Sequence, residues 1–174
     1  MPVQIGAKPD SGFDDPIGLL KDCHRRIERF LDVLCRIAEQ ANGRGLSPEE
    51  VDAVKTSLRY FRESGPRHNA DEEESLFPRL QQAPEILSQV HQLEDEHMRS
   101  MRLHESVDQQ FTAWLAEGAP RDADRLLRET AELREIYTGH IRIEEEVVFA
   151  LAAAVLDRHA IAAMGEEFRS RRNR

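Results

Sequence analysis

The chain has 174 residues, of which 40% are apolar and 33% charged, and its formal net charge is −9 at pH 7. This length suits one domain with a substantial core, and the negative charge argues against nucleic acid as a partner because phosphates would be repelled. No apolar run approaches the ~18 residues of a membrane span, and the N-terminus lacks the apolar core of a signal peptide. Cys23 and Cys35 are too few for a disulfide framework, so we expect a protein of the reducing cytoplasm.

Residues 1–15 are rich in glycine, proline and aspartate, and we expect them to form an irregular N-terminal arm. A first helix follows the arm, because apolar residues then recur every three or four positions until the segment NGRGLSPEE. A second helix begins within that segment, where Ser47 and Glu50 have the spacing of a capping box. The Gly-Pro pair at 65–66 should bend this second helix.

Two more long helices and a short one complete the predicted fold. Residues 86–114 and 126–151 each carry a helical apolar stripe, and a fifth helix is expected over roughly 158–171. The chain ends in the basic sequence RSRRNR, which we interpret as solvated. No segment alternates polar and apolar residues over a useful length, so no sheet is expected. The sequence predicts an all-α fold: an up-down-up-down four-helix bundle over 16–156, followed by a C-terminal helix and basic tail at 157–174.

The predicted core stripes are apolar except at a few histidines and glutamates. On the fourth helix, the stripe runs through His140 and Glu144 to Val147 and Leu151. A buried charge without a partner is costly, so polar residues on a core stripe need partners inside the bundle. The histidines and glutamates on the four stripes are His24, His68, Glu72, His97, His104, His140 and Glu144.

An internal repeat groups most of these residues. The sequences HNADEEESLF at 68–77 and HIRIEEEVVF at 140–149 share the pattern HxxxEEExxF. The upstream histidines, His24 and His97, are separated by nearly the same interval as the two repeats. The chain therefore looks like two copies of one helical hairpin. Packed antiparallel about a pseudo-twofold axis, the copies would bring four histidines and two glutamates to one level of the bundle.

The spacing of histidine and glutamate suits a metal centre. Four residues at about 100° each return to nearly the same helix face, so the imidazole and the carboxylate can reach one centre. A carboxylate can bridge two cations, and four imidazoles with two carboxylates suit two divalent ions of iron, manganese or zinc. By the same angular count, Glu74 and Glu146 should face solvent. Glu73 and Glu145 should lie at the flank, as acceptors for ligand imidazole N–H groups or as substitute ligands.

These motifs resemble the hemerythrin-like, HHE cation-binding domains. The resemblance covers about residues 16–156 and rests on LLKDCHRRI, HNADEEESLFPRL, LEDEHMRSM and HIRIEEEVVF, which stand in family order and spacing. It implies a four-helix bundle that holds two non-haem iron ions with an oxo or hydroxo bridge and two bridging carboxylates. The implied histidine ligands are His24, His68, His97 and His140, and the implied bridging carboxylates are Glu72 and Glu144.

Two positions depart from the family pattern. Asn69 and Leu93 stand where other members often carry histidine, which would leave a coordination position for water, a carboxylate or an outside ligand. The resemblance implies binding or sensing of O2 or NO, or a role in iron handling and the oxidative-stress response. One alternative is a di-iron enzyme that reduces peroxide, NO or O2 on the same bundle. Another is a metal-free helical scaffold that binds a partner protein, and the oligomeric state stays open.

Three further residues near the predicted site have simpler expected roles. His104 lies on the third stripe two turns from the expected ligand, too far to bind the same metal, so we expect a core or second-layer histidine. Tyr137 is expected in the core, one turn from His140. Cys23 precedes a predicted ligand but points in another direction around the helix, so we do not expect it to bind metal.

Overall fold

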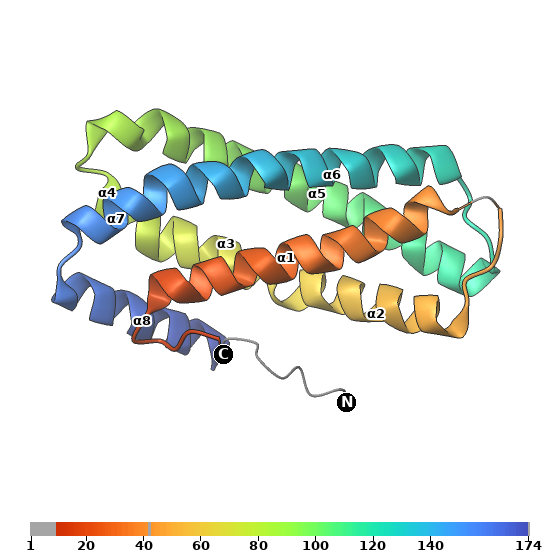
Figure 1. The fold of residues 1–174 in the computed structure, drawn as a ribbon, viewed down its shortest axis with the longest axis horizontal. Helices are drawn as coiled ribbons and strands as arrows, with labels where there is room; N and C mark the ends of the chain where they lie inside the picture. Colours follow the sequence, from red (N-terminus) through yellow and green to blue (C-terminus); the bar gives the residue numbers. More distant parts are fainter. Residues whose placement is uncertain (1–9, 42, 174) are drawn as a thin grey trace.

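The fold is an all-helical bundle, shown by a computed structural model that describes residues 10–41 and 43–173 (Figure 1). Four long helical segments run up, down, up and down, and a further helix packs at one end. The predicted all-α four-helix bundle with a C-terminal helix is confirmed. In the described part of the chain, no helix is long and apolar enough to cross a membrane. Most of the arm expected at 1–15 lies outside the described residues.

The first two long segments form one hairpin. Its elements are α1 (Pro16–Glu39), α2 (Pro48–Glu63), α3 (Gly65–Asp71), the π-helical turn η1 (Glu72–Leu76) and α4 (Phe77–Leu80). The predicted capping box begins α2: the Ser47 side chain accepts from the Glu50 N–H, and the Glu50 carboxylate accepts from the Ser47 N–H. The expected Gly-Pro break separates α2 from α3.

The second hairpin repeats this arrangement. Its elements are the 3-10 turn η2 (Pro84–Ile86), α5 (Leu87–Glu117), α6 (Ala123–Ile143), the π-helical turn η3 (Glu144–Val148) and α7 (Phe149–Val155). Gly118 ends α5 with a φ of 80°, a left-handed conformation that glycine adopts without steric cost. Helix α8 (Arg158–Arg172) then folds back against α1 and α3.

A π-helical turn begins at the glutamate of each HxxxE motif. The Phe77 N–H donates to the Glu72 carbonyl, and the Phe149 N–H donates to the Glu144 carbonyl, five residues back in both cases. Each turn contains one residue more than an α-helical turn, so it rotates the buried face of the following segment by about 100°.

This rotation corrects the predicted core stripe of the fourth segment. Val147 was expected in the core but is 37% exposed, whereas the next residue, Val148, is fully buried. Likewise Ala152 continues the core, and the predicted Leu151 is only partly buried. The prediction was wrong beyond the glutamate because a strict α-helical period does not allow for the extra residue of the π turn.

The core is divided into two apolar clusters with a polar layer between them. One cluster surrounds Phe111 and Trp114, and the other surrounds Phe77 and Phe149. The core histidines predicted as ligands lie, along each long segment, between residues of the first cluster and residues of the second. Burial of these clusters is the main driving force for folding, and it fixes the helices that surround the polar layer.

Candidate metal centre

The structure brings all six predicted ligand residues together in the polar layer. The histidines come one each from α1, α3, α5 and α6, and the glutamates open the two π turns. Every one of these residues is at most 4% exposed. The six residues are His24, His68, Glu72, His97, His140 and Glu144.

The six side chains form two overlapping groups that share both glutamates and differ in their histidine pair. Within each group, one ligand atom from every residue lies within 4.8 Å of the others. The groups are His24, His68, Glu72 and Glu144, and Glu72, His97, His140 and Glu144. Two carboxylates between two imidazole pairs have the chemistry to bridge two cations.

The atoms that face this layer lack ordinary hydrogen bonds. Within the described residues, both carboxylate oxygens of Glu72 and of Glu144 are buried without a hydrogen-bond partner, as are the Nε2 atoms of His24, His97 and His140. Unpaired buried polar atoms cost free energy and are rare in native proteins. Bound cations would give all of these atoms a partner, so the residues present fit a metal centre.

The flank glutamates of the two repeats each hold a histidine of the opposite hairpin. Nδ1 of His24 lies 2.9 Å from Glu145, and Nδ1 of His97 lies 2.7 Å from Glu73. An Nδ1–H that donates to a carboxylate leaves Nε2 as the free ligand atom of a neutral imidazole. The sequence left open whether these glutamates are substitute ligands, and their contacts place them behind the imidazoles as acceptors.

The phenylalanine that ends each repeat also crosses to the other hairpin. Phe149 stacks on the His24 ring with centroids 5.4 Å apart, and Phe77 stacks on the His97 ring at 6.3 Å. These apolar rings cover one face of each imidazole and restrict its rotation. The pattern HxxxEEExxF therefore supplies two candidate ligands from its own helix and supports a third from across the bundle.

The pseudo-twofold symmetry fails at one position. Glu96, the residue before His97, accepts from Nδ1 of His140 at 2.9 Å. The residue in the equivalent place of the first hairpin is Cys23, and its thiol lies beside His68. In the described chain, Nδ1 of His68 has no hydrogen-bond partner. Both imidazoles of the His97–His140 position therefore donate to a carboxylate, whereas in the His24–His68 position only His24 does.

We expect this difference to give the two positions different metal affinities. Loss of the partner behind a ligand imidazole typically costs ~10–100-fold in metal affinity. Glu96→Gln should therefore weaken the tighter of two binding steps by about that factor, whereas Cys23→Ser should leave that step unchanged. Calorimetric titration of the metal-free protein with Zn²⁺ resolves the steps. Two equal steps that Glu96→Gln does not alter would contradict the assignment.

Without metal, the buried carboxylates keep protons on the imidazoles. Burial lowers the pKa of His24, but the nearby carboxylates of Glu144 and Glu72 outweigh this effect and raise that pKa to about 11. Burial is outweighed in the same way at His97, whose pKa Glu72 and Glu73 raise to about 10. Since metal ions and protons compete for these nitrogens, metal binding should release protons.

His104 and Tyr137 form a separate hydrogen-bonded pair beside the polar layer that contains the candidate ligands. His104 Nε2 and the Tyr137 hydroxyl share a hydrogen bond of 3.0 Å, and among the described residues neither side chain belongs to a candidate ligand group. Burial lowers the pKa of His104 to about 4, so its ring is neutral at neutral pH. Burial also raises the pKa of Tyr137 above its usual range.

The neutral state of His104 should make the protein more sensitive to acid than His104→Gln. In the unfolded chain His104 has a pKa near 6.5, whereas in the folded protein its pKa is about 4. Below pH 6.5 the unfolded state therefore binds a proton that the folded state does not, and the folded protein loses stability as the pH falls toward about 4. The expected extra loss at pH 4 is roughly 2–3 kcal/mol. Urea unfolding of both proteins at several pH values measures it, and parallel pH profiles would refute it.

The C-terminal helix holds a buried aspartate next to one candidate ligand. Asp71, which precedes Glu72, is fully buried, and it accepts from Arg171 at 2.9 Å and from Arg172 at 2.7 Å. Arg171 also donates to the Ser75 hydroxyl in η1. The interpretation of the basic tail as solvated was therefore wrong for two of its arginines, which lie against the segment that carries the candidate ligand Glu72.

The fold is a four-helix bundle, and its buried histidine–glutamate layer is able to hold cations. The chain matches the hemerythrin HHE cation-binding domain over residues 15–152, and it belongs to that family. It is also similar to an uncharacterized protein of Haemophilus influenzae, with 27% identity over 161 residues that span 92% of this chain and 91% of the relative. The matched region contains all six candidate ligands and ends before α8.

Proposed function

We propose that this protein binds two iron ions in the buried layer and uses them to bind or sense O2 or NO, or to act in iron handling under oxidative stress. The observation that carries the proposal is the pair of overlapping ligand groups whose inward atoms lack hydrogen-bond partners. Glu72 and Glu144 would bridge the ions, and each ion would also take two imidazoles. Manganese or zinc suits the same donors, and the metal content of the purified protein distinguishes them.

The surrounding residues prepare this layer for redox chemistry. Iron held by imidazole and carboxylate changes its oxidation state and binds small diatomic molecules at open positions. The two glutamates offset the positive charge of the ions, and the carboxylates behind the imidazoles fix the direction of each ring. The stacked phenylalanines exclude water from two of the imidazole faces. Four donors for each ion would leave positions for a ligand from outside.

A di-iron enzyme that reduces peroxide, NO or O2 is the second candidate. It is favoured by the three carboxylates behind the imidazoles, because reduction consumes protons and these groups reach solvent. The side chains of Glu73, Glu96 and Glu145 are 40%, 22% and 30% exposed. Each therefore offers a short route for protons between water and the buried layer.

Metal analysis with a visible spectrum tests the proposal. Protein from iron-supplemented cells should contain two irons per chain and absorb in the near-ultraviolet after oxidation in air. A protein that holds only zinc, or no metal, would refute the iron proposal. Reaction of the reduced protein with NO or peroxide then separates the candidates, since stoichiometric binding supports a sensor and repeated turnover supports an enzyme.

A further inference from the structure

We propose that small uncharged molecules reach the metal layer through a passage between α2 and α5 that the side chains of Phe61 and His104 close. This inference rests on the proposed function, because the passage matters only if the buried layer holds metal.

A small pocket lies about one helical turn from the candidate ligands. It has a volume of about 50 Å³, and its walls include Gly65, Ser100 and Tyr137. Each of these residues is three positions from a candidate histidine ligand on its own segment, which is about one helical turn. Glycine and serine leave space here that larger side chains would fill. The volume is enough for a diatomic molecule, since a water needs only ~10–15 Å³ on this measure.

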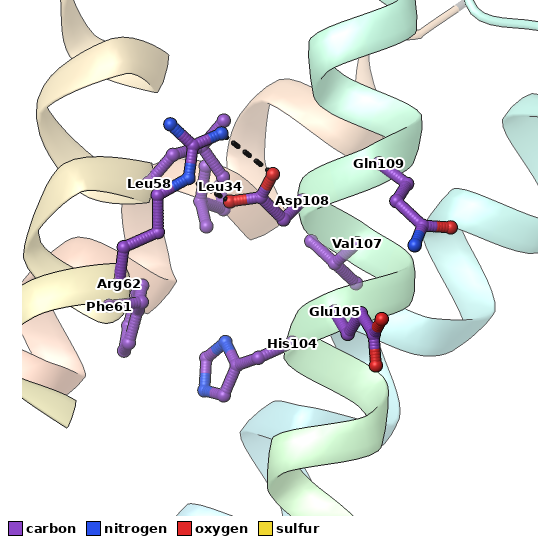
Figure 2. Close-up of a pocket in the computed structure, with 9 residues that line it drawn as sticks. All are labelled: Leu34, Leu58, Phe61, Arg62, His104, Glu105, Val107, Asp108 and Gln109. Atoms are coloured by element: carbon purple, nitrogen blue, oxygen red, sulfur yellow. Dashed lines mark hydrogen bonds and ion pairs between the residues drawn. The ribbon is translucent and has the colours of Figure 1, made fainter. Parts of the chain in front are cut away.

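A larger cavity shares two wall residues, Phe61 and His104, with this pocket. It has a volume of about 340 Å³ and lies between α2 and α5, with Leu34, Leu58 and Val107 among its walls (Figure 2). At its rim Arg62 and Asp108 join the two helices through an ion pair, in which Arg62 Nη2 lies 2.7 Å from Asp108 Oδ1. The ion pair holds the helices together without filling the space beneath it.

Two aromatic rings separate the pocket from the cavity. Phe61 from α2 and His104 from α5 line both spaces, and their ring centroids are 4.3 Å apart. Figure 2 shows the two side chains projecting into the gap between their helices. The His104 ring is held in this position by its hydrogen bond to Tyr137 on the pocket side. Rotation of one of the two rings would join the spaces, and such side-chain rotations are fast compared with movements of whole helices.

The lining of the passage selects its ligand. The inner wall of the cavity carries the apolar side chains of Leu34, Leu58 and Val107 beside Phe61. Of the charged residues, Arg62 and Asp108 neutralise each other at the rim, and Glu105 adds one carboxylate. Because burial lowers the pKa of His104, the gate carries no charge at neutral pH. An ion would lose its hydration in the passage without compensation, whereas a diatomic gas loses very little. The passage therefore suits O2 or NO and disfavours ions.

The Ser100 position offers a matched pair of variants for testing the passage. Ser100→Leu should fill the inner pocket, whereas Ser100→Ala should leave it open, and both lack the hydroxyl group. In the reduced iron-loaded protein, Ser100→Leu should slow NO association about tenfold relative to Ser100→Ala. In the zinc-loaded protein, xenon binding measured by 129Xe NMR should be lost in Ser100→Leu and kept in Ser100→Ala, independently of iron chemistry.

A third variant keeps the test decisive if Ser100→Leu does not fold. Phe61→Ala removes half of the gate and should speed NO association about tenfold at unchanged metal content. Metal-loaded variants that all bind NO at the wild-type rate would overturn the passage and leave the proposed function standing. A protein that binds no metal would overturn both proposals together.

Discussion

Replacing Glu72 with alanine should remove both metal ions, whereas replacing Glu74 should remove neither. Glu72 belongs to both ligand groups, and its two oxygens are fully buried among three histidines. Its loss would take a donor from each ion and leave the imidazoles without the negative charge that faces them. We expect the iron content to fall from two per chain to nearly none, as measured by elemental analysis of protein reconstituted with Fe²⁺.

Two neighbouring glutamates provide graded controls for this experiment. The Glu74 side chain is 66% exposed, so Glu74→Ala should retain full metal content. Glu73 stands behind His97, so Glu73→Ala should lower affinity by ~10–100-fold without abolishing binding. Circular dichroism verifies that each variant is helical. A Glu72→Ala protein that retains both ions would show that this carboxylate is not a bridge.

Asp71→Ala should produce a large loss of stability even though Asp71 is not a candidate metal ligand. The carboxylate is fully buried and accepts from both Arg171 and Arg172, which are themselves 12% and 24% exposed. Removing one partner of a buried ion pair typically costs 3–5 kcal/mol because it leaves the other charges unpaired, and the partial exposure of the arginines moves the expected value to about 3 kcal/mol. Urea unfolding in the presence of a chelator measures this cost without a contribution from metal.

A double-mutant cycle separates the ion pair from the effect of helix packing. Replacing Arg171 and Arg172 together should cost at least as much as Asp71→Ala, because a buried carboxylate then has no partner. Combining all three replacements should restore part of the loss. Asp32→Ala removes an exposed ion pair with Arg36 and should change stability by less than ~0.5 kcal/mol. Additive losses in the cycle would contradict the coupling.

The fold and the candidate ligands could be predicted because both depend on local periodicity. Apolar residues every three or four positions define the helices, and the repeated HxxxE spacing brings an imidazole and a carboxylate to one face. The duplicated pattern supplies the rest, since two equal hairpins packed about a pseudo-twofold axis bring equivalent residues to one level. The structure brings together all six residues that this reasoning selected.

The features that the sequence did not reveal depend on contacts between distant segments or on backbone detail. The hydrogen bond between His140 and Glu96 joins α6 to α5. In the sequence, a comparison of Glu96 with Cys23, its counterpart in the first hairpin, could have pointed to it. The ion pairs of Asp71 with Arg171 and Arg172 join residues about 100 positions apart, and in the sequence such arginines look like an ordinary solvated tail. The π turns were missed because a strict α-helical period, continued past Glu144, selects Val147 and Leu151, whereas the extra residue of the turn places Val148 and Ala152 in the core.

The ion pairs of Asp71 with Arg171 and Arg172 also make α8 an indirect reporter of the buried histidine–glutamate layer. Asp71 is the backbone neighbour of Glu72, so docking of α8 favours one position of that carboxylate. Coupling between two binding events is reciprocal: if docking of α8 raises metal affinity, metal must stabilise the docked helix by the same factor. Slower amide hydrogen exchange in α8 on metal loading would reveal occupancy of the layer from a helix that supplies no candidate ligand.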